Sequence, residues 1–307
     1  LLLFGDGDFD FKRIISSGPN WVPPWETENS FGDPIESFAG DDFFGSYSVP
    51  FKLDVSVGRL CVRSAQDAEN AVDKIIEYET NPVRDGWNNK IIYVADDFQE
   101  EGTLHNDQAD DLAQYKTPSL FEKIKLYSAE FQAIGTSLGR RKPSMNEAII
   151  NEWNRGALII NYTGHGNPRV WTHEQVFTRE STIPKINNKG KYPFLVAATC
   201  NFAQFDNLGT QSSAEILSNK KASGVIAVFA ATRAVYAFSN AQLNQNVYEE
   251  LFITESSGRI IPKRLGDVTR LAKLKMWGDD NQRRFYLLGD PAVEIAIPRE
   301  YAVIDSI

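Results

Sequence analysis

Short apolar runs bounded by turn residues alternate along the chain with segments whose apolar residues recur at helical spacing. This alternation is typical of an α/β fold, in which helices cover a mostly parallel sheet. The apolar runs predict strands at about 1–4, 53–58, 90–96, 123–128, 157–162, 194–199, 224–230 and 293–297.

Three serines mark predicted helix starts. Ser64, Ser144 and Ser212 each precede an acidic residue by three positions and are followed by an apolar face. This is the pattern of a helix N-cap, in which the serine side chain accepts a hydrogen bond from the first turn. Further helices are expected over 240–254 and 262–277.

The segment 17–50 breaks the alternation, because glycine, proline, serine and acidic residues are mixed there with aromatic ones. This mixture predicts a long irregular loop that its aromatic side chains hold down. A softer boundary falls around 80–89, where Asn81 and Pro82 end a helix before the strand at Lys90. We therefore expect an N-terminal subdomain, residues 1–85, that leans on a larger catalytic subdomain, residues 86–307.

Composition narrows the classes of function. The 307 residues carry a formal charge of −9 without a block of Lys and Arg, which argues against nucleic acid as the main partner. Cys61 and Cys200 are too few for a disulfide framework and too far apart for a zinc site built on cysteine pairs. No segment has the apolar length that spans a membrane. Leu1–Phe4 is interpreted as the end of a core strand and not as a signal peptide.

Acidic loops at 5–10 and 40–42 are a weak indication of calcium. As an EF-hand loop starting at Asp6, the first would have Phe11 where glycine belongs and Ser17 where glutamate belongs. That motif fails, so a solvated turn is the better interpretation. We expect no required cofactor and leave calcium open.

The chemistry concentrates at the ends of two predicted strands. The run 157–162 leads into Gly164-His165-Gly166, and the run 194–199 ends at Cys200. Reactive groups collect beyond the carboxyl ends of parallel strands. Histidine can take a thiol proton near neutral pH, and the thiolate is the reactive form. Cys200 is thus the predicted nucleophile and His165 the base, with the N–H groups of Gly166 and Cys200 as oxyanion donors. Glycines beside the histidine would let a substrate backbone approach.

Other interpretations of these residues remain open. Cys200 could be a buried apolar residue at a strand end, the role expected of Cys61. His105 and His173 are the competing bases, but neither has glycine flanks or a place at a strand end, so surface or packing roles are expected for both. A partly ionised thiol in a Cys–His pair should be alkylated at a pH well below that of free cysteine.

These residues resemble a known family. The stretch 161–166, then Trp171, then 197–201, is similar to the gingipain-type cysteine peptidases, peptidase family C25. Similar segments follow at 57–60, 214–215, 224–227 and 289–291, so the resemblance covers nearly the whole chain. It implies a caspase-like α/β fold and a cysteine endopeptidase that works through a thioester.

The resemblance also implies further site residues. An acidic residue after the strand at 90–96 would hold the imidazole, and the register offers Asp96 or Asp97, of which Asp97 is our candidate. A second acid, which in arginine-specific members binds a basic side chain, falls near Asp107, although its surroundings here differ from those enzymes. Trp171 and Tyr236 match aromatic residues that line the substrate pocket, and core packing explains Trp171 equally well.

Within the family, the stretches 3–7 and 41–45 are most similar to the cell-surface sortases of the bacterial type IX secretion system. The similarity implies an enzyme at the extracellular face of the outer membrane, or secreted. It would remove the C-terminal secretion-signal domain from cargo proteins and pass them to lipopolysaccharide, beside other outer-membrane components of that system. The alternatives are a secreted gingipain-like endopeptidase that degrades protein, and a catalytically idle binding scaffold, which would need neither His165 nor Cys200.

Overall fold

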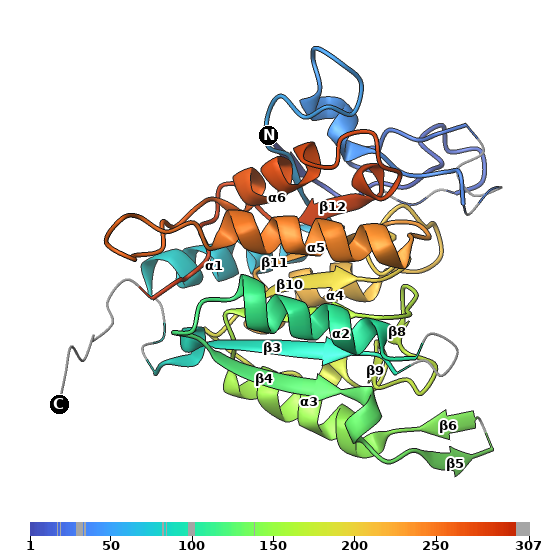
Figure 1. Ribbon diagram of the computed structural model, residues 1–307. Helices are drawn as coiled ribbons and strands as arrows, with labels where there is room; N and C mark the ends of the chain where they lie inside the picture. Colours follow the sequence, from blue (N-terminus) through green and yellow to red (C-terminus); the bar gives the residue numbers. More distant parts are fainter. Residues whose placement is uncertain are drawn as a thin grey trace.

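An eight-stranded sheet runs through the middle of the computed structural model, which describes residues 1–298 except 17, 19, 29–32, 34, 82, 84, 98–101 and 138 (Figure 1). The strand order is β1-β2-β12-β11-β10-β7-β3-β4. Its strands are β1 (Leu2–Phe4), β2 (Gly58–Leu60), β3 (Lys90–Ala95), β4 (Glu122–Tyr127), β7 (Ile159–Thr163), β10 (Phe194–Ala198), β11 (Ala227–Ala231) and β12 (Phe285–Leu288).

All neighbouring strands are parallel except β11 and β12. The predicted mostly parallel α/β sheet is therefore confirmed. Two small antiparallel pairs lie outside it, namely β5 (Ile134–Thr136) with β6 (Gly139–Arg141) and β8 (Val170–Trp171) with β9 (Phe177–Thr178).

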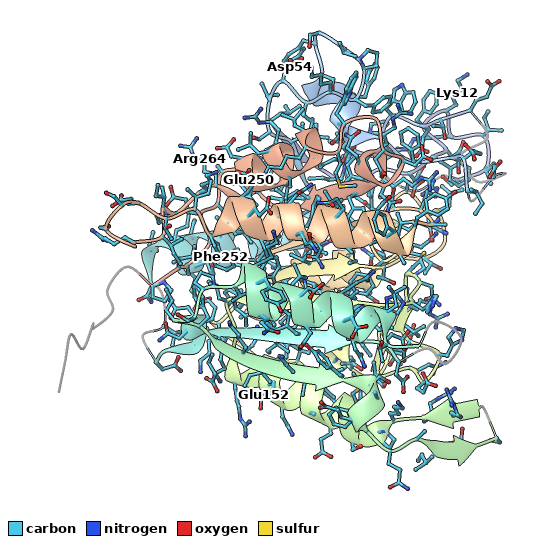
Figure 2. All side chains as sticks on the ribbon, in the orientation of Figure 1. Lys12, Asp54, Glu152, Glu250, Phe252 and Arg264 are labelled. Carbon is cyan, nitrogen blue, oxygen red and sulfur yellow. The ribbon has the colours of Figure 1, made fainter. Side chains whose placement is uncertain are left out.

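Helices cover both faces of the sheet, and side chains fill the space between the layers (Figure 2). In β3, Ile91 and Tyr93 pack in the apolar cluster that includes residues of α2, α5 and α6. Ile92 and Val94 pack in the other cluster, with residues of α3 and α4. Because successive side chains of a strand point to opposite faces, the core consists of two layers. The helices are α1 (Ala65–Thr80), α2 (Leu104–Asp111), α3 (Pro143–Arg155), α4 (Ser213–Asn219), α5 (Ala237–Leu251) and α6 (Leu265–Leu274).

Single helical turns complete the described elements, at Asp41–Gly45, Trp87–Asn89, Leu112–Lys116, Ser128–Glu130, Ile183–Lys185 and Asn281–Arg283. No helix in the described part of the chain is both long and apolar enough to cross a membrane.

Two of the three predicted N-caps are confirmed. The Ser64 side chain accepts a hydrogen bond from the N–H of Asp67, and Ser212 forms a reciprocal capping box with Glu215. The prediction for Ser144 is wrong, because α3 already begins at Pro143. The fixed φ of proline suits the first helical position, so Ser144 lies inside the first turn.

Two predicted strands differ from the structure. Over 53–57 no ladder forms, since the N–H groups of Asp54 and Val55 bond to the carbonyl of Gly45. In the segment 293–297, Val293, Ile295 and Ile297 are buried, but the pairing is limited to a single bridge between Arg264 and Glu294. The actual strand, β12, was missed: all four of its residues are apolar and buried, so they lack the alternation that marks a strand.

The irregular N-terminal part is held by aromatic packing, as predicted for the residues described there. Trp25 lies 4.8 to 5.8 Å, between ring centroids, from Phe38, Phe43 and Phe51. Arg59 of β2, which is fully buried, bonds through both ends of its guanidinium to Asp41 at 2.6 and 2.7 Å. Strands from both expected subdomains thus share one sheet, and a boundary between residues 85 and 86 stays a prediction.

Candidate active site

His165 and Cys200 follow neighbouring parallel strands at the same edge of the sheet. Thr163 of β7 pairs with Ala198 of β10, and each reactive residue stands two positions beyond its paired residue. Both side chains are partly exposed. The strand register therefore brings the two predicted catalytic residues to the same edge, as the sequence indicated.

At the two glycines that flank His165, neighbouring protein atoms occupy the space that a side chain would need. A Cβ atom on Gly164 would lie 2.4 Å from the Cβ of Asp96, and one on Gly166 would lie 2.7 Å from the hydroxyl oxygen of Thr199. Both distances are too short for a real contact. Close packing of the strand ends therefore requires glycine at both positions. The approach of a substrate backbone to these glycines stays a prediction.

Asp96 contacts His165, the predicted catalytic base. Its carboxylate accepts a hydrogen bond from the backbone N–H of His165 at 3.2 Å, and its own N–H donates to the carbonyl of Thr163. Burial raises the pKa of the Asp96 carboxyl, and hydrogen bonds from backbone N–H groups together with the nearby imidazoles of His165 and His105 offset part of that rise. The groups that favour the Asp96 carboxylate are thus the backbone N–H groups of His165 and Asp97 and the two imidazoles.

Asp97, our candidate for the third catalytic member, is held in a different direction. Its carboxylate accepts hydrogen bonds from the ammonium of Lys142 at 2.5 Å and from the hydroxyl of Ser128 at 3.0 Å. Of the two acids left open by the sequence, the structure brings Asp96 to His165 and turns Asp97 toward Lys142.

All three histidines of the sequence meet at this site. The rings of His105 and His173 lie 5.4 and 5.8 Å, between centroids, from the ring of His165. His105 is buried on α2 and meets His165 edge-on, while His173 is exposed. The packing role expected for His105 and the surface role expected for His173 agree with their burial, but both rings are neighbours of His165, the predicted base.

The sulfur of Cys200 is held by the backbone of Val235. The Val235 N–H donates to Sγ at 3.4 Å, and the thiol donates to the Val235 carbonyl at 3.6 Å. Burial raises the pKa of the Cys200 thiol, and the Val235 N–H and the guanidinium of Arg284 offset only part of that effect. Desolvation thus outweighs the groups that favour the thiolate, which disfavours ionisation of the free thiol. The partly ionised thiol expected from the sequence stays a prediction for alkylation to test.

Gly166, one of the two predicted oxyanion donors, packs against Thr199, the residue before Cys200. Gly166 forms a bridge with Trp171 through two flanking hydrogen bonds, from Thr172 N–H to His165 and from Asn167 N–H to Val170, which leave the Gly166 N–H outside the ladder. Directly after Cys200, Asn201 has a φ of +57°. Asparagine tolerates this left-handed conformation, so the chain can turn sharply behind the nucleophile.

The three predicted substrate-binding residues have different surroundings. Trp171 has no exposed surface and stacks on Tyr162 at 4.3 Å and on Phe177 at 4.5 Å, so the structure places it in the core. Tyr236 is 52% exposed and follows Val235, the residue that contacts the nucleophile. Asp107 is exposed on α2, where its carboxylate accepts a hydrogen bond from Thr103 at 2.7 Å.

One group of acidic residues in the described part of the chain could hold a metal ion. Oxygen atoms of Asp96, Asp97 and Glu174 lie within 4.8 Å of one another. Lys142 and Arg140 already bond to Asp97 and Glu174, so positive charge occupies much of this cluster. In the N-terminal acidic loop, the Asp10 carboxylate accepts three backbone N–H groups, from residues 14–16. Calcium binding stays a prediction.

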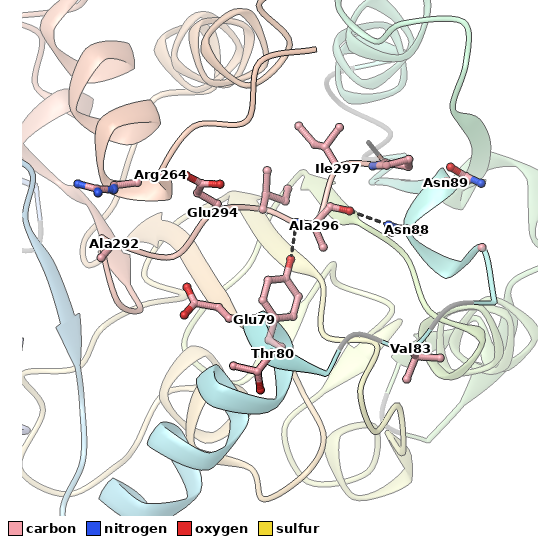
Figure 3. A pocket seen from close by; sticks show the side chains of 14 residues that line it. Glu79, Thr80, Val83, Asn88, Asn89, Arg264, Ala292, Glu294, Ala296 and Ile297 are labelled. Atoms are coloured by element: carbon pink, nitrogen blue, oxygen red, sulfur yellow. Dashed lines mark hydrogen bonds between the residues drawn. The ribbon is translucent and has the colours of Figure 1, made fainter. Parts of the chain in front are cut away.

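A cavity of about 900 Å³ lies at the opposite edge of the sheet, where β3 begins (Figure 3). It is bounded by the end of α1, the turn before β3 and the segment 292–298. The hydroxyl of Tyr78 accepts from the N–H of Ala296 at 2.8 Å, and the Asn88 side chain donates to the Ala296 carbonyl at 2.7 Å (Figure 3). This cavity is therefore separate from His165 and Cys200.

Sequence reasoning missed the residues that hold the segment next to the nucleophile. The Asn281 side chain pairs with both backbone groups of Tyr236, at 3.0 and 2.8 Å, and Arg284 donates to the carbonyl of Ala234 at 2.7 Å. No local motif marks these contacts, because the two partners of each lie about 45 to 50 positions apart in the chain.

Comparison with known proteins supports the fold and the family. A crystal structure of the Arg-specific cysteine proteinase gingipain R matches 96% of this chain and 63% of its own, with a TM-score of 0.71 and 22% identity. A structure described only as a protease matches the whole chain and 67% of its own, with a TM-score of 0.69 and 16% identity. The caspase-like, gingipain-like fold class is thus confirmed.

Curated relatives include two proteins of Porphyromonas gingivalis. Gingipain R2 is 24% identical over 275 residues, 81% of this chain and 34% of that protein, and gingipain R1 is 23% identical over 263 residues, 78% of this chain and 24% of that protein. The chain therefore spans about a third or less of the length of these relatives. The model of peptidase family C25 matches residues 1–296, and the chain belongs to that family.

Proposed function

We propose that this chain is a cysteine endopeptidase in which Cys200 is the nucleophile and His165 the general base. One observation carries the proposal: both residues stand two positions beyond a directly paired residue of neighbouring parallel strands. Membership of peptidase family C25 supports the same assignment.

The chemistry follows from these positions. His165 takes the thiol proton as the sulfur attacks the peptide carbonyl and a C–S bond forms. The N–H groups of Gly166 and Cys200 stabilise the resulting oxyanion. The C–N bond then breaks, the imidazolium gives its proton to the leaving amine, and a thioester remains. Because burial raises the pKa of the Cys200 thiol, we place its deprotonation at the attack on bound substrate.

The fate of the thioester decides the biological role. Water would give hydrolysis, whereas an amine would give a new amide bond. We propose a PorU-type sortase of the type IX secretion system, acting at the cell surface on cargo with a C-terminal signal domain and transferring it to lipopolysaccharide. The sequence stretches 3–7 and 41–45 support this finer role through their resemblance to such sortases.

The second candidate is a gingipain-like endopeptidase that cleaves after basic residues. Gingipain R, the structural neighbour, is described as Arg-specific. The exposed carboxylate of Asp107 favours this candidate, since it could bind a basic side chain. The two candidates share Cys200 and His165, so only substrate preference separates them.

A mass-spectrometric digest under reducing conditions tests both candidates. The substrate pool contains mixed proteins together with junctions between cargo and secretion-signal domains, with and without an added amine. The wild-type chain is compared with Cys200→Ala and His165→Ala. Cys61→Ala is the matched control, because it removes the other thiol, which is fully buried.

Cleavage confined to the junctions, with amine captured at the new C-terminus, would establish the sortase. Cleavage after Arg or Lys throughout the pool, lost on Asp107→Asn, would favour the second candidate. Both candidates require that Cys200→Ala abolishes cleavage and that Cys61→Ala retains it. Cleavage that persists in Cys200→Ala would refute the assigned nucleophile.

A further inference from the structure

The segment 234–236 is fixed at each of its three residues. Arg284 donates to the carbonyl of Ala234 at 2.7 Å, and Val235 exchanges hydrogen bonds with the sulfur of Cys200. The Asn281 side chain pairs with the N–H and the carbonyl of Tyr236. The nucleophile therefore rests on a backbone segment that side chains of a distant part of the chain hold in place.

Arg284 is itself rigidly placed. It directly precedes β12, and its carbonyl accepts a hydrogen bond from Thr232 N–H at 2.9 Å at the end of the β11–β12 ladder. The side chain is almost fully buried, with its guanidinium 5.9 Å from the ring centroid of Tyr236. A second guanidinium nitrogen donates to the carbonyl of Ile35, so the residue also ties the N-terminal loop to this segment.

The charged and titratable groups near Cys200 lie on both sides of β10, the strand that leads to this residue. On the β7 side stand His165, across the paired strand ends, and the phenol of Tyr162, whose pKa burial raises well above its ordinary value, so that it stays neutral. On the other side, beyond β11, stands Arg284, whose charge favours the thiolate. Arg284 thus supplies a permanent positive charge that acts on the thiol.

We propose that Arg284 is a positioning residue for the nucleophile, which fixes the segment 234–236 against the Cys200 sulfur and stabilises the thiolate with its charge. Lysine at this position would keep the charge but not the planar fork that serves two carbonyls. Glutamine would keep a hydrogen-bond donor but lose the charge. The lysine and glutamine variants therefore separate the effect of the charge on the thiolate from the effect of the hydrogen bonds on the segment 234–236.

The test measures alkylation of Cys200 by iodoacetamide across a pH series, read by mass spectrometry for the wild type, Arg284→Gln and Arg284→Lys. Cys61, which is fully buried, stays unlabelled as long as the fold is intact. Arg283→Gln is the matched control, since it removes the neighbouring positive charge. Exchange of the Val235 amide with deuterium, measured in parallel, reports on the segment itself.

The expected midpoint of alkylation in Arg284→Gln lies about one pH unit above that of the wild type. In Arg284→Lys the midpoint stays at the wild-type value while the Val235 amide exchanges faster, and Arg283→Gln leaves both readouts unchanged. Equal midpoints in all variants, or equal upward shifts for lysine and glutamine, would overturn the proposal. If labelling of Cys61 reveals unfolding of the glutamine variant, Arg284→Met replaces it as the variant without the charge, and the same rise of the midpoint relative to Arg284→Lys is expected.

The inference rests on the proposed role of Cys200 as nucleophile, yet the two can fail separately. Alkylation measures the thiol itself and needs no substrate. Absence of Cys200-dependent cleavage would therefore refute the proposed function while the alkylation series still decides the role of Arg284.

Discussion

The carboxyl group of Asp96 affects both the free energy of unfolding and the charge next to His165. Burial raises its pKa, so the folded protein favours the protonated form. A carboxyl group with a raised folded pKa stabilises the fold at low pH, and this contribution is lost as the pH rises through the folded pKa. As the pH rises, ionisation of the buried Asp96 therefore lowers stability, while it places a negative charge beside His165.

Asp96→Asn should separate these two effects. The amide oxygen can still accept the His165 N–H, but the buried charge is gone. We expect the variant to unfold at pH 7 at the same urea concentration as the wild type or higher, with cleavage slowed roughly tenfold or more. Asp97→Asn is the control: it loses the partner of Lys142, so stability should fall more than activity. Full activity of Asp96→Asn would rule out this role.

Gly164 offers a second test at the scale of one residue. An added methyl group would meet the Cβ of Asp96, an atom that cannot swing away as the end of a long side chain can. Gly164→Ala should lower the free energy of unfolding by about 1–3 kcal/mol. The control is Gly209→Ala, where the nearest atom is 3.9 Å from the added methyl group. Urea denaturation of both variants checks this, and equal stabilities would contradict the packing reason for the glycine.

How far the sequence predicts the site depends on the kind of contact. His165 and Cys200 could be predicted because each ends an apolar run that becomes a strand, and parallel strands share an edge. The choice between Asp96 and Asp97 could not, because it depends on which way the chain turns after β3. The role of Arg284 could not be predicted either. Its contacts with Ala234 and Ile35 depend on the position of β12, a strand whose sequence shows no alternation of apolar and polar residues.

At the scale of elements, the ammonium of Lys74 joins two helices. It lies on α1, is 3% exposed, and donates to the carbonyls of Leu217 and Ser218 near the end of α4 and of Val225 before β11. A cation at the C-terminal end of a helix also interacts favourably with the helix dipole. Burial lowers the pKa of Lys74 to about 7, which is the cost of placing the charge there.

Lys74→Met should destabilise the protein, because three buried carbonyls would lose their donor. Each unsatisfied group costs about 1–3 kcal/mol, and part of this is regained by removing the buried charge. We expect a net loss of roughly 2 kcal/mol in urea unfolding. Lys189→Met, at an exposed lysine on the rim of the same region, should change stability little. Equal effects of the two substitutions would show that Lys74 does not join α1 to α4.

The elements were predicted unevenly for physical reasons. Ser64 and Ser212 cap helices through contacts within four residues, which the sequence displays directly. α2 carries few apolar residues, so the sequence shows no apolar face at helical spacing from which this helix could be predicted. The segment 293–297 has the apolar residues of a strand, but Val293 and Ile295 pack into the core without a ladder.

At the scale of the whole molecule, buried carboxyl groups give stability a pH dependence. Burial raises the pKa of Asp6 to about 6, although Arg63 and Arg59 oppose the rise, and raises that of Asp42 to about 6 against the pull of Lys273. Between pH 4 and 6 the folded protein holds these protons and the unfolded chain releases them. These two groups therefore lower the free energy of unfolding as the pH rises through this window.

Asp6→Asn should remove its share of this dependence. A pKa of about 6, against the ordinary value of 3.8, corresponds to at most about 3 kcal/mol. The variant should therefore gain stability over the wild type between pH 4 and 7 by up to that amount. Urea unfolding at several pH values checks this, with Asp111→Asn, at an exposed position on α2, as the control. A constant difference between Asp6→Asn and the wild type across the range would mean that Asp6 keeps an ordinary pKa.

The position of β12 between β2 and β11 affects when the sheet can form during synthesis of the chain. At about 5–20 residues per second, β2 leaves the ribosome roughly 10 to 45 s before the strand that must pair with it. Until then the first strands have no link to β11, and Arg284, which directly precedes β12, has not yet bound the segment 234–236 beside Cys200. The nucleophile is thus completed among the last parts of this domain to be synthesised, and a nascent chain should remain unable to cut itself or its neighbours.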